Sequence, residues 1–343
     1  MKSKRQVITG AISAASLFLL IIDSKTAIEA ARNGIALCIQ TVLPSLFPFF
    51  IISYILISSL NGSTIPILRP IARLTGVPEG GEPILLIGLL GGYPVGAQSI
   101  AALHRNKQIL TKDARRLLGF CNNAGPSFIF GILGSCFTKA ESLWAIWLIH
   151  ILSALLVGAI LPQKRNYRIK NQPQQTTQIK GVIKNATQTS AIVCGWVVTF
   201  RIIIAFLQKW ILWIFPSLGE TTIIGAMELV NGCLRLQSIS CEGLRFCFCS
   251  VFLAFGGLCV AMQTASVTEA IGTGSYFLGK VMQMLISFIL SYFYQLFRFE
   301  GTNRYDQQPL TMVLLLLIVL LSLKHFLFSK KTVAFHADVV YNK

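Results

Sequence analysis

Residues 88–98 read GLLGGYPVGAQ and residues 121–131 read CNNAGPSFIFG, and each stretch interrupts a charge-free apolar run. The two runs, 83–104 and 117–138, each have about the 20 residues that a membrane-spanning helix needs. Glycine loosens a helix and proline removes an amide donor, so neither run is expected to form one unbroken helix. Non-helical backbone at membrane depth is tolerated only when it is buried in protein or lines a wet cavity. The two stretches therefore predict discontinuous helices inside a membrane protein.

Two further apolar runs carry similar interruptions. Run 33–68 contains PSLFP at 44–48, and run 246–268 contains a glycine pair. Four interruptions in one chain are typical of the broken helices and re-entrant hairpins of secondary transporters. The residues that we expect at helix breaks are Gly91, Gly92, Pro94, Gly125, Pro126, Gly256 and Gly257.

The composition indicates a membrane protein over most of the chain. Of the 343 residues, 54% are hydrophobic and 13% are charged, whereas an ordinary soluble domain has about 25% charged residues. This excludes a soluble globular enzyme, because one soluble core could not bury so much apolar surface. The net charge of +17 comes from 30 Lys and Arg against 13 Asp and Glu. Such an excess is expected in cytoplasmic loops, and nucleic-acid binding is the weaker explanation of it.

The basic residues predict how the runs are oriented. The first run, 6–22, follows a basic N-terminus and is expected to be an uncleaved membrane anchor. We treat 83–104 and 220–242 as hairpins that enter and leave on one side, and the other runs then alternate from a cytoplasmic N-terminus. Loops on the cytoplasmic side carry 20 Lys and Arg in this arrangement, and loops outside carry 8. The asymmetry agrees with the positive-inside rule and predicts that both termini are cytoplasmic.

This topology contains an internal symmetry. Residues 25–161 are predicted to form a broken span, a hairpin, a broken span and a plain span, and residues 185–300 repeat that order in the opposite orientation. An inverted repeat of this kind places binding near the midplane of the membrane. The predicted fold class is an all-α polytopic membrane protein, an inverted-topology repeat with discontinuous helices and two re-entrant helical hairpins. The remaining parts are the anchor at 1–24, a polar cytoplasmic linker at 162–184, and a C-terminal transmembrane helix with a basic tail at 301–343.

The interrupted stretches also resemble a known family. Together with TVLPSLFPFFI (41–51), GAMELVNG (225–232) and AFGGLCVAMQ (254–263), they are similar to the YlbJ-type sporulation integral membrane proteins. Those proteins belong to the wider group with Gate, or nucleoside-recognition, domains. The resemblance covers residues 25 to 300 approximately, and it implies two Gate domains, a distant relation to concentrative nucleoside transporters, and a role in endospore formation. It also implies movement of dipicolinate from the mother cell into the forespore, across the membrane that surrounds the forespore.

Two ionisable residues are predicted inside apolar runs. Glu228 is the only acid in 221–234, and an ionisable group at the midplane costs about 3 kcal/mol or more unless it is paired or wet. We expect it to bind a coupling ion or the substrate; the alternative is a carboxylate in a wet loop near the outer surface. Arg201 has apolar neighbours on both sides. It needs an anion, either Glu228, a lipid headgroup or the substrate, unless it extends to the interface.

Neutral polar residues at or beside the breaks are further candidates for solute binding. They are Gln98, Asn122, Asn123, Ser127, Asn231, Gln263 and Thr264. Amides and hydroxyls can bond a planar polar solute, or a carboxylate near a half-helix N-terminus. The alternative is hydrogen bonding between helices, worth about 1 kcal/mol for each group. For Asn122 and Asn123 we favour solute binding, because two adjacent amides exceed what one break needs for capping. Tyr93 is expected to pack within its hairpin.

No motif in the chain indicates catalysis or a bound cofactor. The histidines are isolated, the nine cysteines form no CxxC pair, and hydrolase and nucleotide-binding signatures are absent. We therefore expect no enzyme, no metal and no cofactor. The first hypothesis is a transporter or permease for a small organic anion or a nucleoside-like solute, and the second is a non-transporting scaffold or accessory subunit of a sporulation assembly. The expected partners are the lipid bilayer, a small solute and, in a homo-oligomer, further copies of the chain, without nucleic acid.

Overall fold

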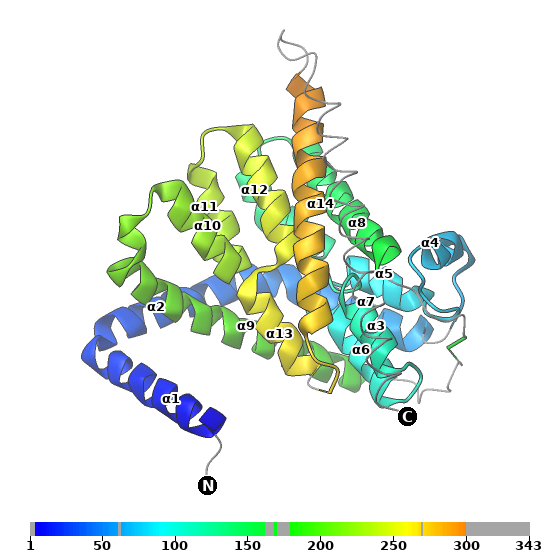
Figure 1. Cartoon of the computed structure of the whole chain (residues 1–343), viewed down its shortest axis with the longest axis horizontal. Coiled ribbons are helices and arrows are strands. Elements are labelled where there is room, and N and C mark those ends of the chain that lie inside the picture. Colours follow the sequence, from blue (N-terminus) through cyan, green and yellow to red (C-terminus); the bar gives the residue numbers. More distant parts are fainter. Residues whose placement is uncertain (1–3, 61–62, 162–167, 170–178, 269, 300–343) are drawn as a thin grey trace, which may run out of the picture.

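A computed structural model describes residues 4–60, 63–161, 168–169, 179–268 and 270–299, and its regular elements are helices (Figure 1). Within these residues, five helical stretches are long and apolar enough to cross a membrane: Ser24–Leu60, Ala140–Ile160, Ile179–Trp210, Glu242–Val267 and Gly274–Arg298. The chain is thus an all-helical polytopic membrane protein, as its composition predicts, and it contacts the lipid bilayer. The C-terminal helix expected within 301–343 and most of the linker 162–184 lie outside the described residues.

The first two helices are set at an angle to each other. α1 (Lys4–Ile22) extends away from the other helices in Figure 1, and its apolar side chains are largely exposed. α2 (Ser24–Leu37) begins at Asp23, whose carboxylate accepts a hydrogen bond from the amide of Thr26 at 3.4 Å. A carboxylate at this position satisfies one of the free amides of the first turn. The exposed apolar surface of α1 suits contact with lipid, as expected for an anchor.

Residues 44–48 remain helical, so the break predicted there is wrong. Helix α2 continues through a π-helical turn, Cys38–Val42, into α3 (Leu43–Leu60), which keeps a proline in its interior. The hydroxyl of Ser45 donates to the carbonyl of Thr41 at 2.7 Å. Local π turns and side-chain hydrogen bonds satisfy the carbonyls that prolines leave without an amide, and the helix can therefore continue.

The first predicted hairpin is a pair of short helices. α5 (Glu82–Leu90) and α6 (Val95–Arg105) pack against each other and are joined by residues 91–94. Within this link Gly92 has a φ of 81°, a conformation that residues with side chains rarely adopt. The break therefore lies where the glycines predict it. A 3₁₀ turn at Pro66–Leu68 and the short α4 (Arg69–Leu74) precede this pair.

The second interruption is longer than a simple kink. α7 (Thr111–Leu118) is followed by segment 119–126, of which residues 119–125 contain no helix. The chain then forms a π-helical turn, Ser127–Ile132, and a 3₁₀ turn, Leu133–Cys136. α8 (Ala140–Ile160) completes the first half as a plain span.

Glycines allow segment 119–126 to cross the first helix pair. A Cβ added to Gly96 would lie 2.3 Å from the carbonyl oxygen of Cys121, and one added to Gly88 would lie 2.5 Å from the same oxygen. A Cβ added to Gly125 would lie 3.1 Å from the amide nitrogen of Gly92. The two interrupted stretches, 88–98 and 121–131, are therefore in direct backbone contact, at positions where only glycine fits.

The second half has elements in a comparable order. α9 (Ile179–Trp210) is one long helix without the break predicted for its span, and 3₁₀ turns at Leu212–Ile214 and Leu236–Ser238 are the minor elements. α10 (Ser217–Met227) and α11 (Leu229–Arg235) pack against each other on either side of Glu228. α12 (Glu242–Phe255) and α13 (Gly257–Val267) are separated at Gly256, which has a φ of 79°. α14 (Gly274–Phe299) is a plain span, and in Figure 1 it stands beside α12 and α8.

The two halves meet at their helix breaks. The hydroxyl of Tyr93 donates to the carbonyl of Leu253 at 3.1 Å, close to the break at Gly256. Tyr93 thus reaches the other half of the molecule, whereas the sequence predicted packing within its own hairpin. The order of elements agrees with a repeat, but the symmetry itself and the orientation of both short helix pairs in a membrane stay predictions.

Candidate functional site

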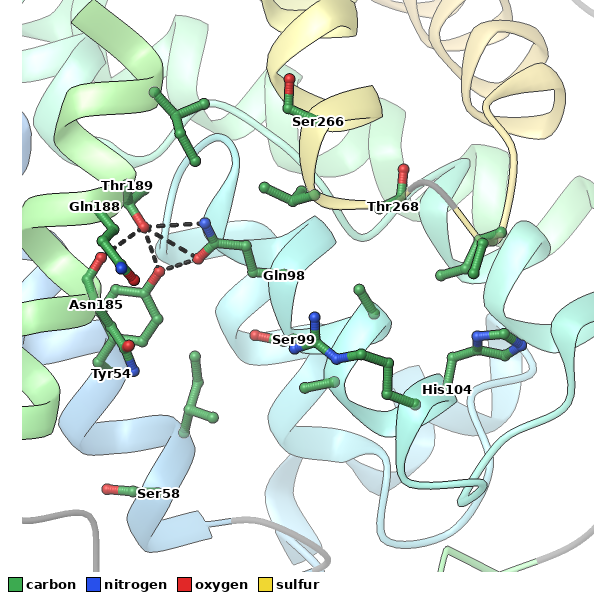
Figure 2. A pocket seen from close by; sticks show the side chains of 18 residues that line it. Tyr54, Ser58, Gln98, Ser99, His104, Asn185, Gln188, Thr189, Ser266 and Thr268 are labelled. Carbon is green, nitrogen blue, oxygen red and sulfur yellow. Dashed lines mark hydrogen bonds between the residues drawn. The ribbon is translucent and has the colours of Figure 1, made fainter.

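A polar cavity lies between the two halves of the molecule. It has a volume of about 580 Å³ and is lined by α3 and α6 from the first half and by α9 and the end of α13 from the second. Arg105, Asn185 and Gln188 line it and are exposed, so the cavity reaches the surface. Figure 2 shows its polar lining residues: Tyr54, Ser58, Gln98, Ser99, His104, Asn185, Gln188, Thr189, Ser266 and Thr268. We call this cavity the vestibule.

Three side chains of the vestibule form a hydrogen-bonded cluster between the halves. The hydroxyl of Tyr54 donates to Oε1 of Gln98, and Nε2 of Gln98 lies 3.0 Å from Oγ1 of Thr189. The hydroxyls of Tyr54 and Thr189 are 2.6 Å apart. Figure 2 shows the three side chains turned toward one another from α3, α6 and α9. The Tyr54–Gln98–Thr189 cluster therefore joins three helices of the two halves through polar groups that line the vestibule.

A smaller cavity lies deeper in the protein along the same helices. Residues 185–192 of α9 contribute to the lining of the vestibule, and Val193 and Val197 of the same helix line the smaller, inner cavity. On α13, the inner cavity is lined by Val260 and Gln263. Its volume is about 30 Å³, which is enough for one or two water molecules, approximately. Its other lining residues include Gly92, Tyr93, Gly125 and Glu228. The inner cavity thus borders the helix breaks of both halves.

Glu228 is buried, with 1% of its surface exposed, and it caps α11. Oε1 accepts the amide of Val230 at 3.0 Å, and Oε2 accepts the amide of Asn231 at 2.7 Å and the Asn231 side chain at 2.6 Å. Hydrogen bonds to a charged acceptor are about twice as strong as neutral ones. A carboxylate here therefore stabilises the helix start while one edge borders the inner cavity.

Arg201 is linked to this carboxylate through a third residue. Its Nη1 donates to Oδ1 of Asn231 at 3.1 Å, and Asn231 in turn donates to Glu228. Among the described residues, the ion pairs within 4 Å do not include one between Arg201 and Glu228. Arg201, Asn231 and Glu228 are thus brought together as a chain of hydrogen bonds, with Gln263 on the same inner cavity.

The paired asparagines are bonded to protein groups. Asn122 accepts the amide of Ala97 at 3.2 Å and donates to Oγ1 of Thr264 at 2.9 Å. Asn123 donates to the carbonyls of Gly88 and Phe120 at 2.9 and 2.7 Å. Both asparagines are fully buried. They fasten segment 119–126 to the neighbouring helices, and neither lines the vestibule or the inner cavity; solute binding by them stays a prediction.

The remaining predicted residues occupy different places. Gln98 lies in the vestibule cluster, and Gln263 donates to the sulfur of Cys259 at 3.4 Å. Ser127 is buried at the start of the π-helical turn Ser127–Ile132. No group of three His, Cys, Asp or Glu side chains within the described part of the chain is arranged to hold a metal ion.

Lys280, Tyr54 and Thr189 were not among the residues predicted from the sequence. Lys280 is fully buried in α14. The sequence contains a signal for this burial, because Lys280 and Arg201 are the two basic residues that the predicted topology places in no loop. Tyr54 and Thr189 are 135 residues apart. Their partnership depends on how α3 packs against α9, for which one sequence carries no local signal.

Comparison with known proteins supports the resemblance seen in the motifs. The chain is 35% identical over 169 residues to the sporulation integral membrane protein YlbJ of Bacillus subtilis (strain 168), an alignment that covers 46% of this chain and 40% of that relative. The aligned part is thus well under half of the relative's length. No protein-family profile matches the chain, and no solved structure matches it. The chain is therefore an integral membrane protein with a bacterial sporulation homologue, and the predicted resemblance to YlbJ-type proteins is confirmed.

Proposed function

We propose that this chain is a transporter that moves a small organic solute through the vestibule and the inner cavity. One observation carries the proposal: a cavity of about 580 Å³ with polar lining residues lies between the two halves, in a chain whose long helices are apolar. Ligand cavities of 300–1,000 Å³ with a few polar groups are typical of small-molecule sites. A smaller cavity lies further along α9 and α13, beside the helix breaks.

The basic rim of the vestibule favours an anionic solute. Arg105 lines it at the C-terminal end of α6, and a cation at a cavity mouth raises the local concentration of anions. Dipicolinate, which the family resemblance implies, is accordingly our first candidate, and movement into the forespore would be the sporulation role. A nucleoside-like solute is the second candidate, because amides and hydroxyls such as those of Gln98 and Thr189 also suit an uncharged polar molecule.

The alternative function is a membrane scaffold or accessory subunit of a sporulation assembly. A scaffold requires no polar cavity between its halves, whereas a transporter does. The proposal assigns the chain no catalytic reaction. Reconstituted protein in liposomes, supplied with labelled dipicolinate or labelled nucleosides, tests it directly: solute uptake above that of empty liposomes is expected for one of them. Equal uptake by empty liposomes for both solute classes would favour the scaffold.

The vestibule cluster predicts the effect of a single hydroxyl. Thr189→Val keeps the side-chain shape and removes the oxygen that bonds Gln98 and Tyr54. Losing one or two hydrogen bonds of about 1 kcal/mol each should lower uptake about tenfold, while the amount of protein in the membrane stays near wild type. Uptake into liposomes and membrane abundance are the two measurements.

The same helix offers a matched control for that variant. Thr199 is exposed on α9 and bonds the carbonyl of Gly195 at 2.8 Å, just as Thr189 bonds that of Asn185 at 2.9 Å. Thr199→Val therefore removes the same local bond without touching the vestibule. If both variants reduced uptake equally, the cluster would have no specific part in transport.

The predicted orientation can be tested with a native cysteine. All nine cysteines are free, and Cys241 is exposed, while the others are buried or partly buried. Cys241 precedes α12 in the stretch predicted to lie outside. An impermeant maleimide is expected to label Cys241 in intact cells, and to leave a cysteine introduced at 165–175 unlabelled until the cells are opened. Labelling of the linker from outside would overturn the topology and the inverted repeat with it.

A further inference from the structure

Lys280 is a buried cation whose hydrogen-bond partners are neutral. Its Nζ donates to Oδ1 of Asn123 at 2.9 Å and to Oε1 of Gln283 at 2.8 Å, and the side chain has 0% exposure. The nitrogen lies 5.1 Å from the ring centre of Tyr93 and 5.8 Å from that of Tyr276. Among the described residues, none of the ion pairs within 4 Å involves Lys280. Within the described part of the chain, an ammonium group here has no paired anion to compensate its charge.

Among the described residues, the elements packed around Lys280 bring further titratable groups, and none of their carboxylates forms an ion pair with Lys280. Five titratable residues come from the elements nearest to Lys280. They are His150 of α8, Cys121 of segment 119–126, Tyr93 of the 91–94 link, Cys259 of α13 and Tyr276 of α14 itself. The charged groups of the other packed elements, α7 and α12, are Lys112, Asp113, Arg115, Arg116, Glu242 and Arg245.

Two of these charged groups, Arg115 and Glu242, have partners near the ends of α14, and Arg116 donates to the carbonyls of Thr75, Gly76 and Gly158. Arg115 donates to the carbonyl of Ile271, before α14 begins. Glu242 pairs with Arg298 at 3.6 Å, 18 residues beyond Lys280 and therefore about 27 Å along the helix. His150 accepts the amide of Ala124 through Nε2 at 3.2 Å, and its backbone carbonyl accepts the side chain of Gln283. The surroundings of Lys280 are therefore polar and neutral.

A positive charge on the buried Lys280 side chain is energetically unfavourable compared with the same charge in water. An uncompensated buried ion costs several kcal/mol, and a buried amine relieves that cost when it releases its proton. The Lys280 amine keeps these partners in either state, because a neutral amine still has N–H groups to donate to the amide oxygens of Asn123 and Gln283. Its position also connects the parts that would move: Asn123 belongs to the segment at the first-half breaks, and Tyr93 bonds the second half at Leu253.

We propose that Lys280 is the residue through which transport is coupled to protons. The inference rests on the proposed transport function and adds the coupling ion to it. When the Asn123–Lys280–Gln283 cluster is closed, as in this structure, the lysine is an amine; when the halves part and water enters, the amine takes one proton from hydronium and leaves water. Closing on the other side returns that proton to water. Each cycle forms and breaks one N–H bond, and the solute moves with the same conformational change.

The test uses liposomes that contain the full-length protein, a trapped pH-sensitive dye and labelled dipicolinate. An imposed pH gradient is expected to drive the wild type to accumulate the solute and to change the dye signal. Lys280→Met has a similar length and cannot titrate, and Lys280→Gln keeps a hydrogen-bond donor. Both should still exchange labelled for unlabelled solute, but their pH-driven accumulation should fall about tenfold or more, the equivalent of 1.4 kcal/mol. Lys184→Met, at an exposed lysine of α9, should behave as wild type.

The outcomes separate this inference from the proposed function. If Lys280→Met and Lys280→Gln accumulate solute under a pH gradient as the wild type does, or if the wild type accumulates it without a dye response, the coupling role is wrong and transport stands. If the wild type moves no solute at all, the transport proposal fails first.

A measurement without solute then decides on the lysine. The melting temperature of the wild type minus that of Lys280→Met is expected to rise by about 3 °C or more from pH 6 to pH 10. The folded protein holds Lys280 as an amine while the unfolded chain binds a proton there, so raising the pH favours the folded wild type. A difference that stays constant over this range would overturn the inference.

Discussion

Gly96→Ala is expected to remove most of the folded protein from the membrane. A Cβ at this position would lie 2.3 Å from the carbonyl oxygen of Cys121, and the obstacle is backbone, which cannot rotate away. Segment 119–126 would have to shift, although Ala97 and Asn122 bond it to the same helix at 3.2 Å. We expect a loss of about 3 kcal/mol or more in the free energy of unfolding, measured by membrane abundance and by thermal unfolding in detergent.

A second glycine provides the matched control. Gly195 lies in α9, and a Cβ added there meets nothing within 4 Å. Gly195→Ala should leave abundance unchanged or raise stability slightly, because alanine restricts the unfolded chain and favours a helix. If Gly96→Ala were as abundant as Gly195→Ala, the close crossing of α6 by segment 119–126 would be wrong.

The helix breaks were predictable where backbone geometry alone requires them. Gly92 and Gly256 have positive φ values of 81° and 79°, and a glycine flanked by apolar residues is a local signal for such a conformation. The break at 44–48 was predicted wrongly because proline is an ambiguous signal. A π-helical turn and a hydroxyl such as that of Ser45 can satisfy the freed carbonyls, and the sequence does not reveal whether they do.

The site was predictable in its chemistry but not in its partnerships. Burial of Glu228 followed from its apolar surroundings, and its capping of α11 required knowing that the helix begins at residue 229. The contact of Lys280 with Asn123 joins residues 157 positions apart. Such contacts depend on the packing of whole helices, so a single sequence indicates that a buried lysine needs partners without indicating which ones.

Glu228→Asp is expected to separate the two roles of the buried carboxylate. Aspartate is a preferred residue at helix N-termini, so it can still accept the amides of Val230 and Asn231. Its shorter side chain withdraws the carboxylate from the inner cavity that Glu228 lines. Abundance should therefore stay close to wild type, while uptake falls about tenfold or more if the carboxylate binds solute or coupling ion, since each lost interaction is worth about 1.5 kcal/mol.

Glu228→Gln should instead lower both quantities. The amide nitrogen would replace one oxygen and face donors on Asn231, leaving buried donors unsatisfied at about 1–3 kcal/mol. Arg201→Gln should not restore abundance in the double variant, because Arg201 bonds Asn231 and not the carboxylate. Recovery by the double variant would show a direct ion pair and remove both residues from the site. Normal uptake by Glu228→Asp would leave Glu228 as a helix cap alone, and the solute path would then depend on Gln263 and the vestibule cluster.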